Sequence, residues 1–183
     1  MDQALWAAEL ARKLLEVPLP RRWDHVQGVA AQAHSLAPIL GDDADLLEAA
    51  AWLHDLGYSP ELADTGFHPL DGARYLRDSQ CADPTLCGLV ANHSCAIIEA
   101  EYRGLAAELS REFPCPEPML TDALAYCDMT TTPDGQMVSV YDRLAEIRER
   151  YGPHSLVTRF TYRAEPHLIS SVRHTTRLLE SVR

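Results

Sequence analysis

The fold is indicated most directly by the stretch AAWLHDLG at residues 50–57. An apolar run with helical spacing, which starts at Leu46 and Leu47, leads into the adjacent polar pair His54-Asp55. Gly57 is expected just past the end of this helix. A carboxylate in the last turn of a helix faces the negative end of the helix dipole. This mismatch of roughly 0.3–1 kcal/mol would be reversed by a bound cation.

Three further polar side chains stand where an apolar helical stripe would otherwise continue, namely His25, His93 and Asp128. Burying such a group without a partner costs about 1–3 kcal/mol. Each one alone could be a core histidine bonded to a carbonyl, or an aspartate that caps a turn. Together with His54 and Asp55 they lie on four predicted helices, and one divalent cation would serve as a partner for all of them.

The ordered set resembles the HD-domain metal-dependent phosphohydrolase superfamily, and within it the bacterial HD/HDIG-type hydrolases. The resemblance covers about residues 20 to 152. Residues 22–30 resemble the helix that carries the first ligand, here His25, and residues 50–57 resemble the "LLHDIG" signature. Residues 68–73 resemble an "H-x-x-x-G-A" segment, and the segments 91–94 and 126–130 resemble those that carry the later ligands, here His93 and Asp128. Segment 68–73 resembles the one found in the bacterial subgroup that includes diadenosine tetraphosphate hydrolases. The chain departs from that subgroup after the doublet, where residues 57–60 read GYSP and no lysine follows.

The resemblance implies a set of site residues. His25, His54, Asp55 and Asp128 would be the central metal ligands, with Asp55 as the bridge if two ions bind. His68 and His93 would either ligate a second ion or hold the substrate phosphate and protonate the leaving oxygen. The predicted metal ligands are therefore His25, His54, Asp55, His68, His93 and Asp128, and the predicted catalytic residues are Asp55, His93, His68 and Arg22.

The ligand types favour particular ions and a particular reaction. Imidazole nitrogens with carboxylate oxygens suit Mn, Fe, Co, Ni or Zn better than Ca, with Mg as a further candidate and one or two ions bound. The predicted reaction is attack of a metal-activated water on phosphorus. Arg22 lies one helical turn before His25, from where it could stabilise the added negative charge.

We therefore expect an enzyme that hydrolyses a phosphomonoester or phosphodiester of a small nucleotide-like metabolite. Two alternatives remain open on the sequence. An HD-type di-iron oxygenase acting on a small hydroxylated substrate would use the same six ligands. A regulatory module could hold metal without catalysing any reaction.

Composition limits the partners. The net charge of −11 would repel duplex nucleic acid at long range, so a small phosphorylated metabolite is the expected partner. No stretch of eighteen apolar residues occurs, so no contact with a membrane is expected, and we expect a cytoplasmic protein. The five cysteines form no C-x-x-C pair, and free thiols are expected. The oligomeric state is left open.

Helical periodicity runs almost throughout the chain, which predicts an all-α, single-domain helical bundle over residues 1–183 with the metal site in its core. Residues 153–183 would form a C-terminal helical extension to the motif-bearing region. The expected helices lie at about 3–17, 24–39, 43–56, 69–79, 84–109 with a break, 118–129, 137–151 and 165–182.

Overall fold

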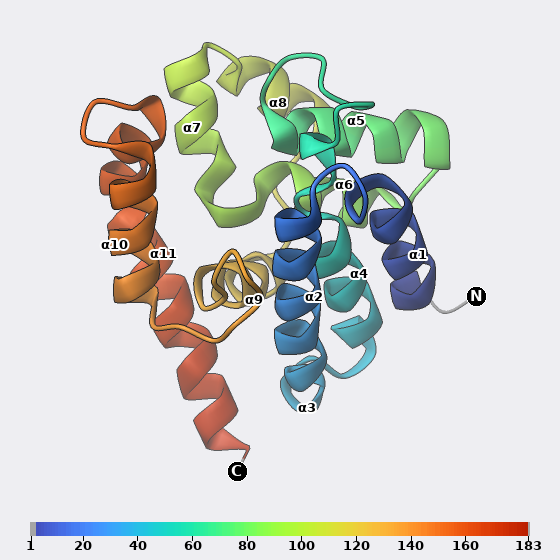
Figure 1. Cartoon of the computed structure of the whole chain (residues 1–183). Coiled ribbons are helices and arrows are strands. Elements are labelled where there is room, and N and C mark those ends of the chain that lie inside the picture. The colour runs from blue at the N-terminus through green and yellow to red at the C-terminus, as the bar shows by residue number, and fades with distance from the viewer. Residues whose placement is uncertain (1–2, 183) are drawn as a thin grey trace.

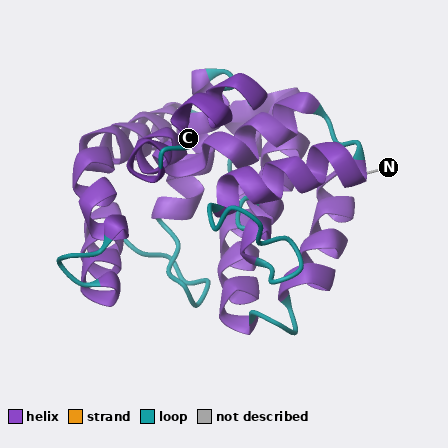
Figure 2. Cartoon of the chain, turned by 90° about the horizontal axis from the view of Figure 1, so that it is seen from above, coloured by secondary structure: helices purple, strands orange, loops and turns teal. Residues whose placement is uncertain are grey.

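Helices make up most of residues 3–182, the part of the chain that the computed structural model describes (Figure 1; Figure 2). No β-strand occurs within those residues, where Thr131 and Met137 form an isolated bridge. The all-α prediction is confirmed. The α-helices are α1 (Gln3–Leu15), α2 (Pro20–Ser35), α3 (Ala37–Leu40), α4 (Ala44–Leu53), α5 (His68–Gln80), α6 (Pro84–Asn92), α7 (Ala96–Arg103), α8 (Ala106–Glu112), α9 (Pro118–Met129), α10 (Val140–Tyr151) and α11 (Leu156–Ser181). Short 3-10 turns are η1 (Gly41–Asp43), η2 (Leu56–Tyr58) and η3 (His93–Cys95).

Helices α2 and α4 lie side by side, and α1 packs on α4 (Figure 1). Trp23 of α2 stacks on Trp52 of α4, with ring centroids 5.5 Å apart. This pairing is part of a large apolar core to which α1, α2, α4, α5, α6 and α9 contribute. It places the buried face of α2, which bears His25, beside the end of α4 that leads to His54.

A glycine in α2 lets the loop after α9 approach closely. A Cβ atom at residue 28 would lie 2.5 Å from the carbonyl oxygen of Gly135, and Gly135 has a φ of 75° that favours glycine. The close approach holds the Thr132 carbonyl against the ring of His25, where its oxygen is 2.9 Å from Nδ1. The glycine pair therefore positions one of the predicted ligands.

Helices α10 and α11 pack on α9 and form a second, smaller apolar cluster. Tyr126 and Ile97 touch both clusters, so the two are joined through α9 and α7. Helix α11 begins at Leu156, well before the predicted start at residue 165. Ser155 caps it by accepting a hydrogen bond from the Thr158 N–H (3.0 Å), and Pro166 is accommodated inside the helix although prolines favour the first turn.

Two other expectations from the sequence are corrected. Helix α4 ends at Leu53, so Gly57 is not a glycine just past its end but lies in η2, and its φ is not positive. The break expected within 84–109 is found at η3, where Ser94 and Cys95 have φ values of 47° and 63°, so the second corrected expectation is the place of His93 on one helical stripe. His93 therefore stands just past the end of α6 rather than on a continuous helical stripe. This break turns its side chain toward the other predicted ligands.

The helix predicted at 137–151 begins later, at Val140, because residues 131 and 137 pair across a loop and Ser139 caps α10. The helix predicted at 118–129 has those bounds. No helix within residues 3–182 combines the length and the apolar character needed to cross a lipid bilayer.

Candidate metal centre

The six predicted ligands meet in two groups of three. In each group the candidate ligand atoms all lie within 4.8 Å of one another, which is close enough for one ion to bind all three. The first group is His25, His54 and Asp128, and the second is Asp55, His68 and His93. They come from α2, the ends of α4, α6 and α9, and the start of α5.

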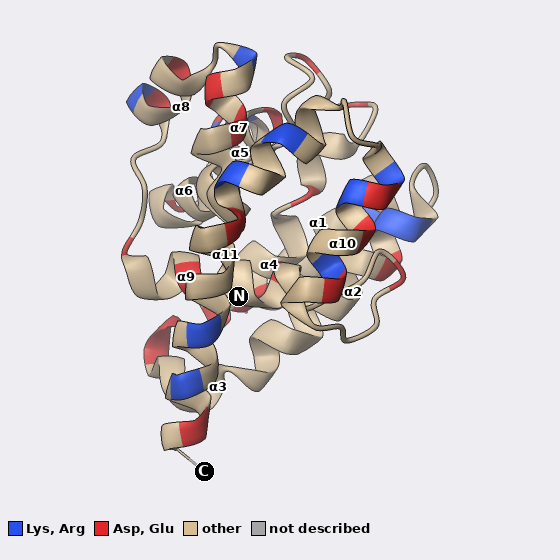
Figure 3. Cartoon of the chain, turned by 90° about the vertical axis from the view of Figure 1, so that its left-hand side faces the viewer, with Lys and Arg blue, Asp and Glu red and all other residues tan. Residues whose placement is uncertain are grey.

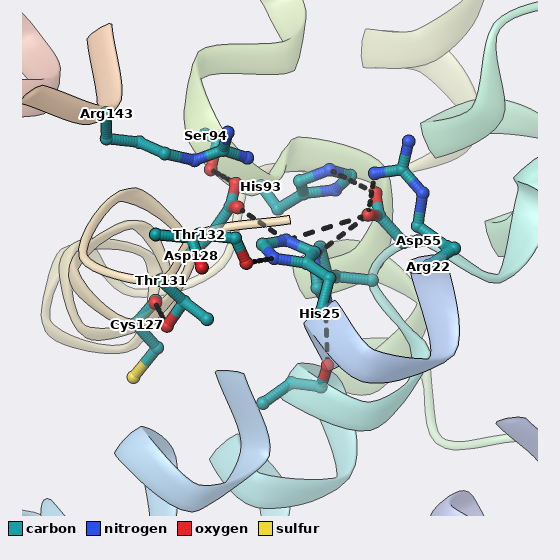
Figure 4. Close-up of polar contacts among 12 residues, drawn as sticks. Arg22, His25, Asp55, His93, Ser94, Cys127, Asp128, Thr131, Thr132 and Arg143 are labelled. Atoms are coloured by element: carbon teal, nitrogen blue, oxygen red, sulfur yellow. Dashed lines mark hydrogen bonds and ion pairs between the residues drawn. The ribbon is translucent and has the colours of Figure 1, made fainter. Parts of the chain in front are cut away.

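Asp55 connects the two groups. Its Oδ2 atom lies 3.4 Å from Nε2 of His54 and 3.8 Å from Nε2 of His25, while its Oδ1 atom lies 3.2 Å from Nε2 of His68 and 3.9 Å from Nε2 of His93. Figure 4 shows Asp55 together with His25 and His93. Each oxygen of this carboxylate thus faces a different group. A carboxylate in this position can bridge two ions.

Three of the four histidines are held in the same way. Their Nδ1 atoms contact backbone carbonyl oxygens at 2.7–2.9 Å, and since a carbonyl only accepts, each Nδ1 carries the proton. When such a ring is neutral, its Nε2 keeps a lone pair for a metal, which is how metal-binding histidines are usually held. The pairs are His25 with Thr132, His54 with Ala51, and His93 with Val90.

The residues fit a divalent ion. The His54 side chain is completely buried, and its Nε2 has no hydrogen-bond partner among the described residues. A buried polar nitrogen without a partner costs about 1–3 kcal/mol, and coordination to a metal would remove this cost. Nitrogen and carboxylate donors together suit Mn, Fe, Co, Ni or Zn.

The charges around the centre keep both aspartates ionised. Burial alone would raise the pKa of Asp55, but Arg22, whose Nη1 lies 2.5 Å from Oδ2, and the neighbouring His54 bring it well below its usual range. Burial likewise opposes ionisation of Asp128, yet a protonated His25, whose Nε2 lies 3.1 Å from Oδ1, and the charge of His54 lower its pKa strongly.

Burial and the neighbouring charges also shift the pKa values of the histidines. Burial lowers the pKa of His54, but the charges of Asp55 and Asp128 outweigh it and raise the pKa above its ordinary value. Burial and the neighbouring histidines lower the pKa of His93 to about 3, so that His93 is neutral and can donate its nitrogen to a metal. The negative potential that favours a proton on His54 would also favour a cation at this point.

A pocket of about 210 Å³ opens beside the centre. Asp55, His68, His93 and Asp128 line one side of it, whereas His25 and His54 do not reach it. The opposite wall comes from α10 and α11 and includes Ile147, Val157, Phe160 and Leu168. The C-terminal segment, to which the sequence assigned no function, therefore contributes to this pocket.

The predicted site residues are all found here, and Arg22 lies against Asp55 with its guanidinium 4.0 Å from the centre of the Tyr58 ring. The sequence did not point to Tyr58, which stacks on His68 with centroids 3.9 Å apart. It also did not point to Ser94, whose hydroxyl donates to Asp128 Oδ2 at 2.5 Å.

Arg143 is a further residue that the sequence did not single out, and it also lines the pocket. A signal for it was present: it lies three residues after Val140 and four before Ile147, so it interrupts an inward stripe as His25 does in α2.

Comparison with curated proteins and with solved structures gives no match. The model of one protein family, described as the HD domain, matches residues 22–147. The matched range covers more than half of the chain and includes all six candidate ligands. The chain therefore belongs to the HD domain family.

Proposed function

We propose that this protein is a metal-dependent phosphohydrolase that acts on a phosphomonoester or phosphodiester of a small nucleotide-like metabolite. Membership of the HD domain family supports metal-dependent hydrolysis in general. The observation that carries the proposal is the position of Asp55, which presents one oxygen to each group of ligands. A substrate in the adjoining pocket would meet both groups.

A divalent ion bound here would lower the pKa of a coordinated water and neutralise phosphate oxygens. The side chains His25, His54, Asp55 and Asp128 would hold it. Arg22 stays positively charged beside Asp55, because the carboxylate outweighs burial and raises the pKa of the guanidinium. Arg22 is therefore suited to stabilise negative charge that develops on the transferred group.

His68 and His93 have two possible roles, which the number of bound ions would decide. Their Nε2 atoms lie 3.1 Å apart, and since Nδ1 of His93 donates to Val90, the proton between the two rings belongs to His68. With one ion bound, His68 would give this proton to the leaving oxygen. With two ions bound, both histidines would be ligands.

The test is phosphate release measured together with metal content. Purified protein is stripped of metal, reloaded separately with Mn, Fe, Co, Ni, Zn or Mg, and screened against phosphomonoesters and phosphodiesters. We expect metal-dependent phosphate release that Asp55→Asn abolishes and that His34→Ala leaves unchanged, because His34 is exposed and bonded to Glu48. Dioxygen consumption without phosphate release would favour the oxygenase alternative and overturn the proposal. Failure of every metal and substrate would favour a regulatory module.

A further inference from the structure

Arg143 combines burial with incomplete hydrogen bonding. The residue is 5% exposed, and Nη1 donates to Glu146 Oε2 at 2.5 Å. Its Nε is buried and has no partner among the described residues. Leaving a buried donor of a charged group unsatisfied is costly, so a further acceptor for this guanidinium would be stabilising.

The guanidinium points toward the candidate metal centre. In Figure 4 the Arg143 side chain extends from α10 toward Ser94 and Asp128. Arg22 approaches the same centre from α2, beside Asp55. Two arginines therefore flank the six candidate ligands: Arg22 lies beside Asp55, and Arg143 extends toward Asp128. Both arginines line the pocket.

Several arginines gather around Arg143 although the chain carries a net charge of −11, and each of them also pairs with a carboxylate. Acidic and basic residues alternate along α10 (Figure 3). Beside the pocket lies a hollow of about 280 Å³ that Arg21, Arg22, Arg143 and Arg150 line, and its described lining contains no carboxylate. An anion entering here would meet guanidinium groups first, because their carboxylate partners are not part of the described lining.

We propose that Arg143 binds the non-bridging oxygens of the substrate's phosphoryl group on the Asp128 side of the centre. The planar fork of an arginine matches phosphate oxygens, and the side chain of Arg143 lines the pocket on the Asp128 side. The inference rests on the proposed phosphohydrolase function and specifies the residue that seats the reacting group. Arg143 would then be a catalytic residue, since it touches the substrate.

The rest of the pocket limits the organic part of that substrate. Its volume of about 210 Å³ is below the roughly 300–1,000 Å³ that is usual for drug-sized ligands. The lining from α10 and α11 includes the apolar side chains Ile147, Val157 and Phe160, which lie in the same lining as Arg143 and Arg150. The pocket therefore favours a phosphoester with a compact, partly apolar organic group over a dinucleotide.

Inorganic phosphate is the probe for the first experiment, with binding to metal-loaded protein followed by calorimetry. Arg143→Gln should weaken phosphate binding by about tenfold or more, because a hydrogen bond to a charged group contributes about 1.5–3 kcal/mol. Arg143→Lys should weaken it less, since charge is kept and the fork is lost. Arg148→Gln is the matched control: Arg148 lies on the same helix, also has a buried Nε without a partner among the described residues, and does not line the pocket.

Unchanged phosphate affinity in Arg143→Gln, at unchanged metal content, would overturn the proposal, as would equal losses in Arg143→Gln and Arg148→Gln. If Arg143→Gln does not fold, Arg143→Lys becomes the test variant, and an unchanged, wild-type phosphate affinity in it would contradict the proposal. Loss of phosphate binding in a protein that hydrolyses no ester would support the anion site while contradicting the hydrolase function, so the two failures are distinguishable.

Substrate preference tests the apolar wall in the wild-type protein. We expect a higher kcat/KM for phenyl phosphate than for glycerol phosphate, and we expect Val157→Asn to narrow this difference mainly through a higher KM for phenyl phosphate. A preference for glycerol phosphate or for a dinucleotide would overturn the assignment of the substrate class.

Discussion

Gly57 lies directly against the backbone of His68, so closely that a Cβ atom at residue 57 would overlap the His68 carbonyl oxygen. The two residues belong to different elements, η2 and α5, which pack on each other. The glycine of the AAWLHDLG stretch thus has a defined role. It lets the first residue of α5 approach Asp55, whose Oδ1 is 3.2 Å from His68 Nε2.

Gly57→Ala should therefore displace His68 from the centre. We expect a loss of stability of about 1–3 kcal/mol from overpacking. We also expect turnover to fall by up to about 100-fold, the effect of misplacing a reacting group by about 1 Å. Thermal unfolding and phosphate release measure the two effects. Gly104→Ala is the control, since its Cβ would meet open space and only its φ of 75° is unfavourable. Wild-type turnover in Gly57→Ala would contradict this role.

Arg22→Ala should destabilise the metal-free protein more than the metal-loaded protein. Asp55 is almost fully buried, and removing one partner of such an ion pair costs about 3–5 kcal/mol. A bound cation would supply the missing positive charge. The measurement is the melting temperature with a chelator and with metal. Arg21→Ala is the control, because its pair with Asp134 is exposed to solvent and such pairs contribute little to stability. An equal loss with and without metal would show that Asp55 does not face the ion.

Glu112 should make stability depend on pH in the acid range. Its hydrogen bonds with Arg74 and Arg77, which outweigh burial, lower its pKa to about 2 from an ordinary value of 4.5. The stabilisation is therefore complete above pH ~4.5 and is lost as the pH falls through about 2. Glu112→Gln should melt below wild type at pH 7, and the difference should shrink as the pH approaches 2. The exposed residue Glu117 provides the control, Glu117→Gln. A difference that is constant with pH would exclude this ion pair as its cause.

Much of the centre could be predicted because its residues break a local rule. His25 and Asp128 are polar groups at positions where helical spacing predicts a buried apolar side chain, and the structure does bury both. The bounds of α9 followed from Pro118 at its start and from regular spacing to residue 129. Helix bounds and buried positions of this kind can be predicted from sequence, because they depend only on one helix and on the core beside it.

What could not be predicted depends on contacts between distant elements. The approach of Gly57 to His68 and the pairing of Arg22 with Asp55 require the relative placement of three segments. Arg143 interrupts a stripe just as His25 does, but arginines at such positions usually extend to solvent, so spacing alone did not distinguish it. The contribution of α11 to the pocket, through residues such as Phe160, follows only from its packing against α9 and α10.

The central claim is that the two groups of side chains bind metal, and the metal content of His54→Ala tests it most directly. Wild-type protein and His34→Ala should each bind at least one divalent ion per chain by elemental analysis after dialysis. His54→Ala should lose bound metal and phosphate release while its circular dichroism stays helical, because the unpaired Nε2 of His54 is removed from a buried position. A His54→Ala protein that keeps the full wild-type complement of metal would contradict the account.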